Sequence, residues 1–242
     1  MHLRTVPLLT AELRVRRARQ LVGVLKRQAQ KWADAHEQFI DVVKGENGRF
    51  QLVVARADAS RLGRMSITIG ETAYNLRSAL DFAVYDVAVL ATQADVSRTQ
   101  FPIEEDPEMF EGRITGKHPR TGRGVTPFLR GVPPTAVEYI RERQPFAGCS
   151  WTRDLRDLSN PDKHRHLASL RSNVKVLVKE SQIVPNPDDP DKGTLNIRYD
   201  AEVEVFLLDG GAPVQEKLEE LCGEVGATLA LLKRHITSEP PR

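Results

Sequence analysis

The sequence predicts an α+β protein: a bundle of long helices with a small antiparallel β-sheet or hairpin packed on it. Apolar residues recur every three or four positions in three long segments, as in amphipathic helices. In the C-terminal third they alternate with polar residues, as in strands. The 242 residues, 40% hydrophobic and 28% charged, are expected to form one domain. Its helical core would cover about 10–165 and 213–237, with a β-hairpin region over about 172–208.

Three long helices are expected over residues 10–43, 66–91 and 214–235. In the first, apolar residues from Leu21 to Val42 recur at helical spacing, and two glycines just beyond them end the helix. In the second, an apolar stripe at close to heptad spacing runs from Ile69 to Leu90. Leucine and valine residues line one face of the third. Each of these helices therefore has one side to bury against the others.

Alternation of apolar and polar residues predicts the strands. Residues 50–54 form one predicted strand, and residues 174–178 and 195–207 form two more, which the loop VPNPDDPDKG would join as a hairpin. Two short helices are expected over 134–143 and 152–158. The basic segment GKHPRTGRGVTP is rich in glycine and proline, so irregular structure and mobility are predicted there.

Several classes of function receive no support from the sequence. The two cysteines, Cys149 and Cys222, form neither a disulfide framework nor a zinc spacing, so buried or inert thiols are predicted, with no metal site and no cofactor. The common nucleotide-binding motifs GxGxxG and GxxxxGK[ST] do not occur. No apolar run approaches the roughly 18 residues of a membrane helix. A cytoplasmic protein without membrane contact is expected.

Positive charge is unevenly placed although the net charge is only +2. Each of two segments contains several basic residues and no acidic residue. The first comprises Arg14, Arg16, Arg17, Arg19, Lys26, Arg27 and Lys31, and the second comprises Arg113, Lys117, Arg120, Arg123 and Arg130. Such clusters fit a phosphate-rich partner, and they equally fit a solvated helix face and a soluble loop.

Polar residues interrupt the middle of the second predicted helix, in the stretch YNLRSALDF. Asn75, Arg77 and Asp81 lie beside its apolar stripe. Arg77 and Asp81 are four residues apart and can pair on one side of a helix. If that side is buried, both charges need partners from other elements, because an unpaired buried charge is costly.

A second polar stretch, LSNPDKHRHL, offers such partners. Asn160 suits a helix N-cap, Pro161 the first helical position, and Asp162 the first turn. The basic groups that these local roles leave unexplained are Lys163, His164, Arg165 and His166. We therefore predict that Arg77 and Asp81 face the segment Asp162 to Arg165 and form one polar centre, whose role is either structural packing or anion binding.

These stretches resemble a set of uncharacterised bacterial and phage proteins. Their pattern runs roughly G-[DE]-x-x-[HY]-N-L-R-S-A-L-D-[HF], then F-P-I, then Q-P-[FY], then L-x-x-L-x-N-x-D-K-H-R. Here it corresponds to Gly70–Phe82, Phe101–Ile103, Gln144–Phe146 and Leu155–Arg165. The resemblance implies a shared fold and assigns no chemistry.

The helix that carries RSALD also looks like the central helix of HEPN domains, a helical class that includes RNA-cleaving toxins. Their signature is an arginine, four to six residues, and then a histidine, and these side chains from paired subunits meet at the scissile phosphate. After Asp81 this sequence has Phe82, whose ring neither takes nor gives a proton. The resemblance implies a HEPN-like bundle, RNA or a nucleotide as partner, and a homodimer as one open state.

Three functions follow as hypotheses. The first is binding of nucleic acid or nucleotide through the polar centre on the second helix, with the candidate residues Asn75, Arg77, Asp81, Asp162, Lys163, His164 and Arg165. The second is a structural or protein-interaction module whose polar cluster only fixes packing. The third is an RNase, degenerate or active, with His164 as general base. Whether the protein is an enzyme stays open at this point, and no catalytic residue is assigned.

Overall fold

The computed structural model describes residues 7–35, 40–44, 50–54, 59–94, 96–159, 170–186, 189–207 and 212–238. Its helices are α1 (Leu9–Ala35), α2 (Ala59–Thr92), α3 (Pro107–Thr115), α4 (Pro134–Arg141), α5 (Ser150–Ser159) and α6 (Val214–Ser238), with a 3-10 turn at Pro145–Ala147. Its strands are β1 (Ile40–Lys44), β2 (Phe50–Val54), β3 (Leu170–Asn186) and β4 (Asp189–Leu207). The described chain is mostly helical.

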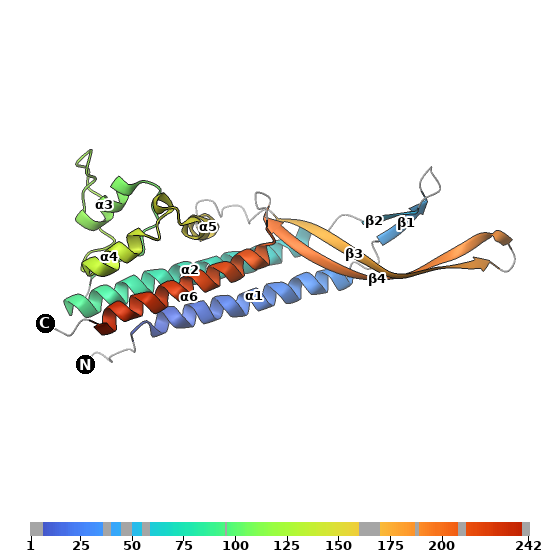
Figure 1. The fold of residues 1–242 in the computed structure, drawn as a ribbon, viewed down its shortest axis with the longest axis horizontal. Coiled ribbons are helices and arrows are strands. Elements are labelled where there is room, and N and C mark those ends of the chain that lie inside the picture. The colour runs from blue at the N-terminus through green and yellow to red at the C-terminus, as the bar shows by residue number, and fades with distance from the viewer. Residues whose placement is uncertain are drawn as a thin grey trace.

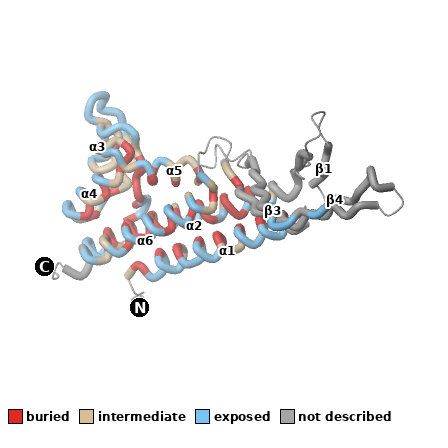
Figure 2. Tube along the Cα trace, turned by 45° about the vertical axis from the view of Figure 1, so that its right-hand side comes forward, coloured by how far each residue is buried: buried red, intermediate tan, exposed pale blue. Residues whose placement is uncertain are grey.

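The three longest helices, α1, α2 and α6, lie side by side as a bundle (Figure 1). Buried residues on each helix face the other two, while the outer faces are exposed (Figure 2). Leu25 of α1, Leu76 of α2 and Leu221 of α6 are fully buried in this core. The prediction of three long amphipathic helices is confirmed.

The first helix ends earlier than predicted. α1 stops at Ala35, and Ile40–Lys44 pairs antiparallel with Phe50–Val54, so that Val42 lies opposite Leu52. The prediction that this helix extends to residue 43 is therefore wrong. The sequence IDVVK is rich in β-branched residues, which favour a strand, and a partner strand follows within a few positions.

The predicted C-terminal hairpin is present and longer than expected. β3 and β4 have 17 and 19 residues, and Val174 lies opposite Val203. Pro185 pairs with Gly193, so much of the predicted loop VPNPDDPDKG belongs to the strands. Near the bundle β4 contacts α1 and α6, and Val205 is buried there. The remainder of this two-stranded ribbon extends beyond the bundle (Figure 1).

A separate group of short helices, residues 96–159, lies against one side of the bundle and is called here the 96–159 module. It contains α3, α4 and α5, and α5 contacts both α2 and α6 (Figure 1). Buried apolar side chains such as Phe110 and Ile140 belong to the same core as the long helices. This module brings the second half of the candidate site to α2.

The basic segment around residue 120 is more regular than predicted. The His118 N–H donates to the Arg123 carbonyl at 2.8 Å, and the Val125 N–H donates to the Gly116 carbonyl at 2.9 Å. Lys117 and Gly124 form an isolated antiparallel bridge. The segment is thus a hydrogen-bonded turn that follows α3, and its mobility stays a prediction.

Among the helices that the structure describes, none combines the length and apolar character needed to cross a bilayer.

Candidate functional site: the polar centre of α2

The polar residues of YNLRSALDF lie on different sides of α2. Asn75 is buried beside α1, where its side-chain oxygen accepts a hydrogen bond from Arg14 Nη1 at 3.2 Å. Its amide nitrogen donates to the Glu71 carbonyl at 2.8 Å. Arg77 and Asp81 instead contact the 96–159 module. The predicted cluster is therefore split, because positions two residues apart point in nearly opposite directions on a helix.

Arg77 and Asp81 bind the main chain of one residue, Phe101. Arg77 Nη2 donates to the Phe101 carbonyl oxygen at 2.5 Å, and the Phe101 N–H donates to Asp81 Oδ1 at 3.0 Å. The two side chains also pair with each other at 3.3 Å. They are 21% and 30% exposed, and the Phe101 residue is fully buried. One ion pair thus satisfies both main-chain polar groups of a core residue.

Burial dominates the electrostatics of this pair. Desolvation lowers the pKa of Arg77, and the carboxylates of Asp81 and Glu104 oppose that change. Desolvation raises the pKa of Asp81, and the Arg77 guanidinium and the Phe101 N–H oppose it. Each group therefore needs the other as its counter-charge.

A second buried side chain, Gln144, holds the next part of the same segment. Its side-chain oxygen accepts the Glu104 N–H at 2.9 Å, and its side-chain nitrogen donates to the Pro102 carbonyl at 3.0 Å. The same nitrogen donates to the Ile140 carbonyl at 2.9 Å. Gln144 is completely buried. The segment Phe101–Glu104, called here the FPIE segment, is thus held by hydrogen bonds at residues 101, 102 and 104.

Three of the four sequence patterns that carried the resemblance meet at the FPIE segment. NLRSALD supplies Arg77 and Asp81, F-P-I is the bound segment itself, and Q-P-F supplies Gln144. In the fourth pattern, Leu155 and Leu158 are buried on α5. The rest of that pattern, including Asp162, Lys163, His164 and Arg165, lies outside the described residues. The predicted contact of these four residues with Arg77 and Asp81 stays a prediction.

The position where HEPN domains would carry histidine faces another direction. The Phe82 ring lies 5.9 Å from the Arg14 guanidinium carbon, and Tyr74 lies at the same distance from it. Both rings are exposed on the α1 side of α2. Phe82 is therefore not beside the Phe101 main chain that Arg77 binds.

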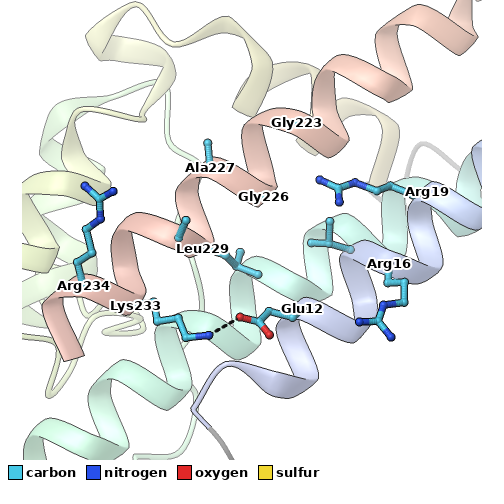
Figure 3. Close-up of a pocket in the computed structure, with 11 residues that line it drawn as sticks. Glu12, Arg16, Arg19, Gly223, Gly226, Ala227, Leu229, Lys233 and Arg234 are labelled. Atoms are coloured by element: carbon cyan, nitrogen blue, oxygen red, sulfur yellow. Dashed lines mark hydrogen bonds and ion pairs between the residues drawn. The ribbon is translucent and has the colours of Figure 1, made fainter. Parts of the chain in front are cut away.

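The basic segments divide into paired and unpaired groups. In the second segment, Arg113 pairs with Glu104 at 2.7 Å, and Arg120 pairs with Glu108. In the first, Lys26 pairs with Glu219 at 2.5 Å. For Arg16 and Arg19, which lie exposed on α1, no acidic partner is found among the described residues. These two arginines border a groove of about 700 Å³ between α1 and α6 (Figure 3).

One group of side chains in the described part of the chain has the spacing of metal ligands. The ligand atoms of Asp106, Glu108 and His118 lie within 4.8 Å of one another. Asp106 already caps α3 by accepting the Glu108 N–H, and Glu108 pairs with Arg120. Both carboxylates therefore have structural roles at the start of α3.

Sequence reasoning missed the partners of the polar centre. Arg77 and Asp81 do pair, and the excess of charge on α2 correctly indicated contacts with another element. The target is main chain, however, and a main-chain carbonyl or N–H has no signature in the sequence. Gln144 was recognisable only as part of a pattern. Comparisons of the chain with protein-family models, with curated proteins and with solved structures found no match.

Proposed function

We propose that the protein is a non-catalytic interaction module, HEPN-like in its central helix, whose polar centre fixes the 96–159 module on α2. The observation that carries this proposal is the shared target of Arg77 and Asp81, the main chain of Phe101. A largely buried ion pair that also bonds the main chain of a core residue favours one packing arrangement, since a shift would separate the two charges from each other and from that main chain. On this proposal Arg77 and Asp81 do not bind the partner themselves, and they hold the 96–159 module in the position in which its surface can do so.

Anion binding at Arg77 is the weaker candidate. The guanidinium already donates to a carbonyl oxygen, and Asp81 neutralises its charge. An incoming phosphate would have to displace that carboxylate from a largely buried position and would meet its negative charge. Nucleic acid or a nucleotide would therefore bind through other cations, among which Lys163, His164 and Arg165 stay candidates.

RNA cleavage of the HEPN type also lacks the histidine that the signature would place after Asp81, where this chain has Phe82. Phe82 has no titratable group, and its ring faces Arg14. Cleavage would depend on His164 lying near Arg77, a contact that stays a prediction.

Removal of one charge from the pair tests the proposal. Asp81→Ala and Arg77→Met should each lower the free energy of unfolding by about 2 kcal/mol, because each leaves a buried partner unsatisfied. Urea denaturation followed by circular dichroism gives this quantity. The matched control is Arg120→Ala, which removes the exposed partner of Glu108 and should change stability by less than about 0.5 kcal/mol.

A binding measurement separates the two roles. Fluorescence anisotropy with a labelled single-stranded RNA should give the same signal for Arg77→Met and for the unchanged protein. An Arg77→Met variant of unchanged stability that loses RNA binding or RNA cleavage would refute the packing role.

A further inference from the structure

The outer face of α6 changes character along its length. Residues spaced three and four apart share one face of a helix. On this face the N-terminal part carries acidic residues, the middle carries glycine and alanine, and the C-terminal part carries basic residues. In chain order the residues are Glu216, Glu219, Glu220, Gly223, Gly226, Ala227, Ala230, Lys233 and Arg234. All are exposed except Gly226 and Lys233, which are half-buried.

The small residues leave the α6 backbone open to close approach (Figure 3). A Cβ atom added at Gly223 would have no neighbour within 4 Å among the described residues, and one at Gly226 would meet only the tip of Arg19, at 3.2 Å. Glycine weakens the interior of a helix relative to alanine. The packing of this chain therefore does not explain Gly223, and at Gly226 only the flexible end of Arg19 would have to move. A second helix lying across both glycines would explain them, because small side chains let two helix axes come close.

The charges select the occupant of this face. Arg16, Arg19, Lys233 and Arg234 line the groove with a single acid, Glu12, so a polyanion would find cations there. The same face continues into Glu216, Glu219 and Glu220, which would repel a polyanion that extended along α6. A partner helix with the opposite order of charge fits both halves, and α6 read in the reverse direction has that order.

We propose that two copies of this chain associate through antiparallel α6 helices. A single register places Gly226 opposite Ala227 of the second copy and Gly223 opposite its Ala230. The same register places Glu220 opposite Lys233 of the second copy and Glu219 opposite its Arg234. A twofold axis between the helices repeats every contact, as in an isologous dimer. Small residues meet small residues at the axis, and acids meet bases at both ends.

The existing ion pairs of these residues do not prevent the exchange. Glu219 pairs with Lys26 at 2.5 Å, Glu220 pairs with Lys217 at 3.2 Å, and Lys233 pairs with Glu12 at 2.7 Å. Apart from Lys217, their side chains are roughly half exposed, so such pairs are weak and rearrange easily. The twofold axis brings Arg19 of both copies to the same side, which opposes association. We therefore expect a dissociation constant on the order of 10 μM rather than nanomolar.

A charge exchange tests the register. Sedimentation velocity of the full chain should show a reversible monomer–dimer equilibrium. Glu219→Arg and Arg234→Glu should each raise the dissociation constant about tenfold, because each creates two symmetry-related like-charge contacts. The double variant Glu219→Arg/Arg234→Glu should restore the original value, since the opposite pairs form again. Glu108→Arg/Arg120→Glu, an exchange in a surface pair on the 96–159 module, is the matched control and should have no effect.

Three results would overturn the proposal. The first is a monomer up to the highest soluble concentration. The second is a dimer whose dissociation constant ignores both single reversals while circular dichroism shows folded protein. The third is a double variant whose dissociation constant is no lower than those of the single variants. None of these outcomes depends on the packing role of Arg77 and Asp81.

Discussion

The side-chain oxygen of Gln144 accepts the main-chain N–H of Glu104 across 2.9 Å, although the two residues are 40 positions apart in the chain. With its amide nitrogen on the carbonyls of Pro102 and Ile140, this one side chain ties the end of α4 to the FPIE segment. The two bonds of the amide nitrogen are buried, and the bond to the Glu104 N–H is partly buried. Gln144 is therefore the second fixed point of the 96–159 module, beside the Arg77 and Asp81 pair.

Gln144→Leu should lower the free energy of unfolding by about 3 kcal/mol. Leucine fits the volume but leaves the Glu104 N–H and the Pro102 carbonyl without their partner. Urea denaturation measures the change. Gln100→Leu, at an exposed position next to the FPIE segment, is the control and should have little effect. Equal stability of Gln144→Leu and the unchanged protein would mean that the hydrogen bonds of Gln144 do not hold the segment.

Gly131→Ala should destabilise the protein by about 2 kcal/mol or more. Gly131 has φ of +79°, and an added Cβ would lie 2.8 Å from Thr92 Cγ2 and 3.2 Å from Val96 Cγ1. Both the left-handed backbone and the overlap oppose a side chain there. Gly124→Ala, where nothing lies within 4 Å of the added carbon, should be close to neutral in the same thermal melts. A neutral Gly131→Ala would contradict the described path of the chain after α2.

The thiol of Cys222 should react only when the protein unfolds. Burial raises its pKa to about 11, with a smaller opposing effect from Arg19, so little thiolate forms at pH 8. The residue is also buried between the long helices. In a Cys149→Ser background, labelling by a disulfide reagent should be slow and should accelerate in step with added urea. Fast labelling in native buffer would show that α6 opens locally.

Glu105 should contribute stability at neutral pH that disappears in acid. Arg153 donates to it twice at 2.9 Å and Arg156 donates at 2.9 Å, and the Arg153 hydrogen bond is the main cause that lowers its pKa. Because the folded pKa lies below the ordinary value of 4.5, this stability is complete above 4.5 and is lost as pH falls through the folded pKa. Melting temperatures of Glu105→Gln and the unchanged protein should therefore differ at pH 7 and converge in acid. A gap that stays constant with pH would assign the difference to packing.

Periodicity predicted the long helices because each buries one continuous stripe, which is visible without knowledge of its partner. In α2 the buried stripe runs from Ile69 to Val87, and the predicted last member, Leu90, is exposed. Periodicity failed at Val42, whose spacing from earlier apolar residues fits a helix while its β-branched neighbours favour a strand. The charge excess on α2 predicted that Arg77 and Asp81 need partners. Their actual partner, the Phe101 main chain, could not be predicted, since neither its carbonyl nor its N–H differs in sequence from any other.

α6 packs against α1 and α2, and its Lys233 pairs with Glu12, 221 residues earlier in the chain. This packing of distant segments has a consequence for synthesis on the ribosome. α1 and α2 emerge first, and the faces that α6 will cover stay open to solvent while the 96–159 module and the β3–β4 ribbon are made. The bundle can close only after α6 has left the exit tunnel, so the growing chain carries an uncovered apolar surface for most of its elongation. Translation that stops before α6 should therefore yield a chain that aggregates or is degraded, even though most of its residues have already been made.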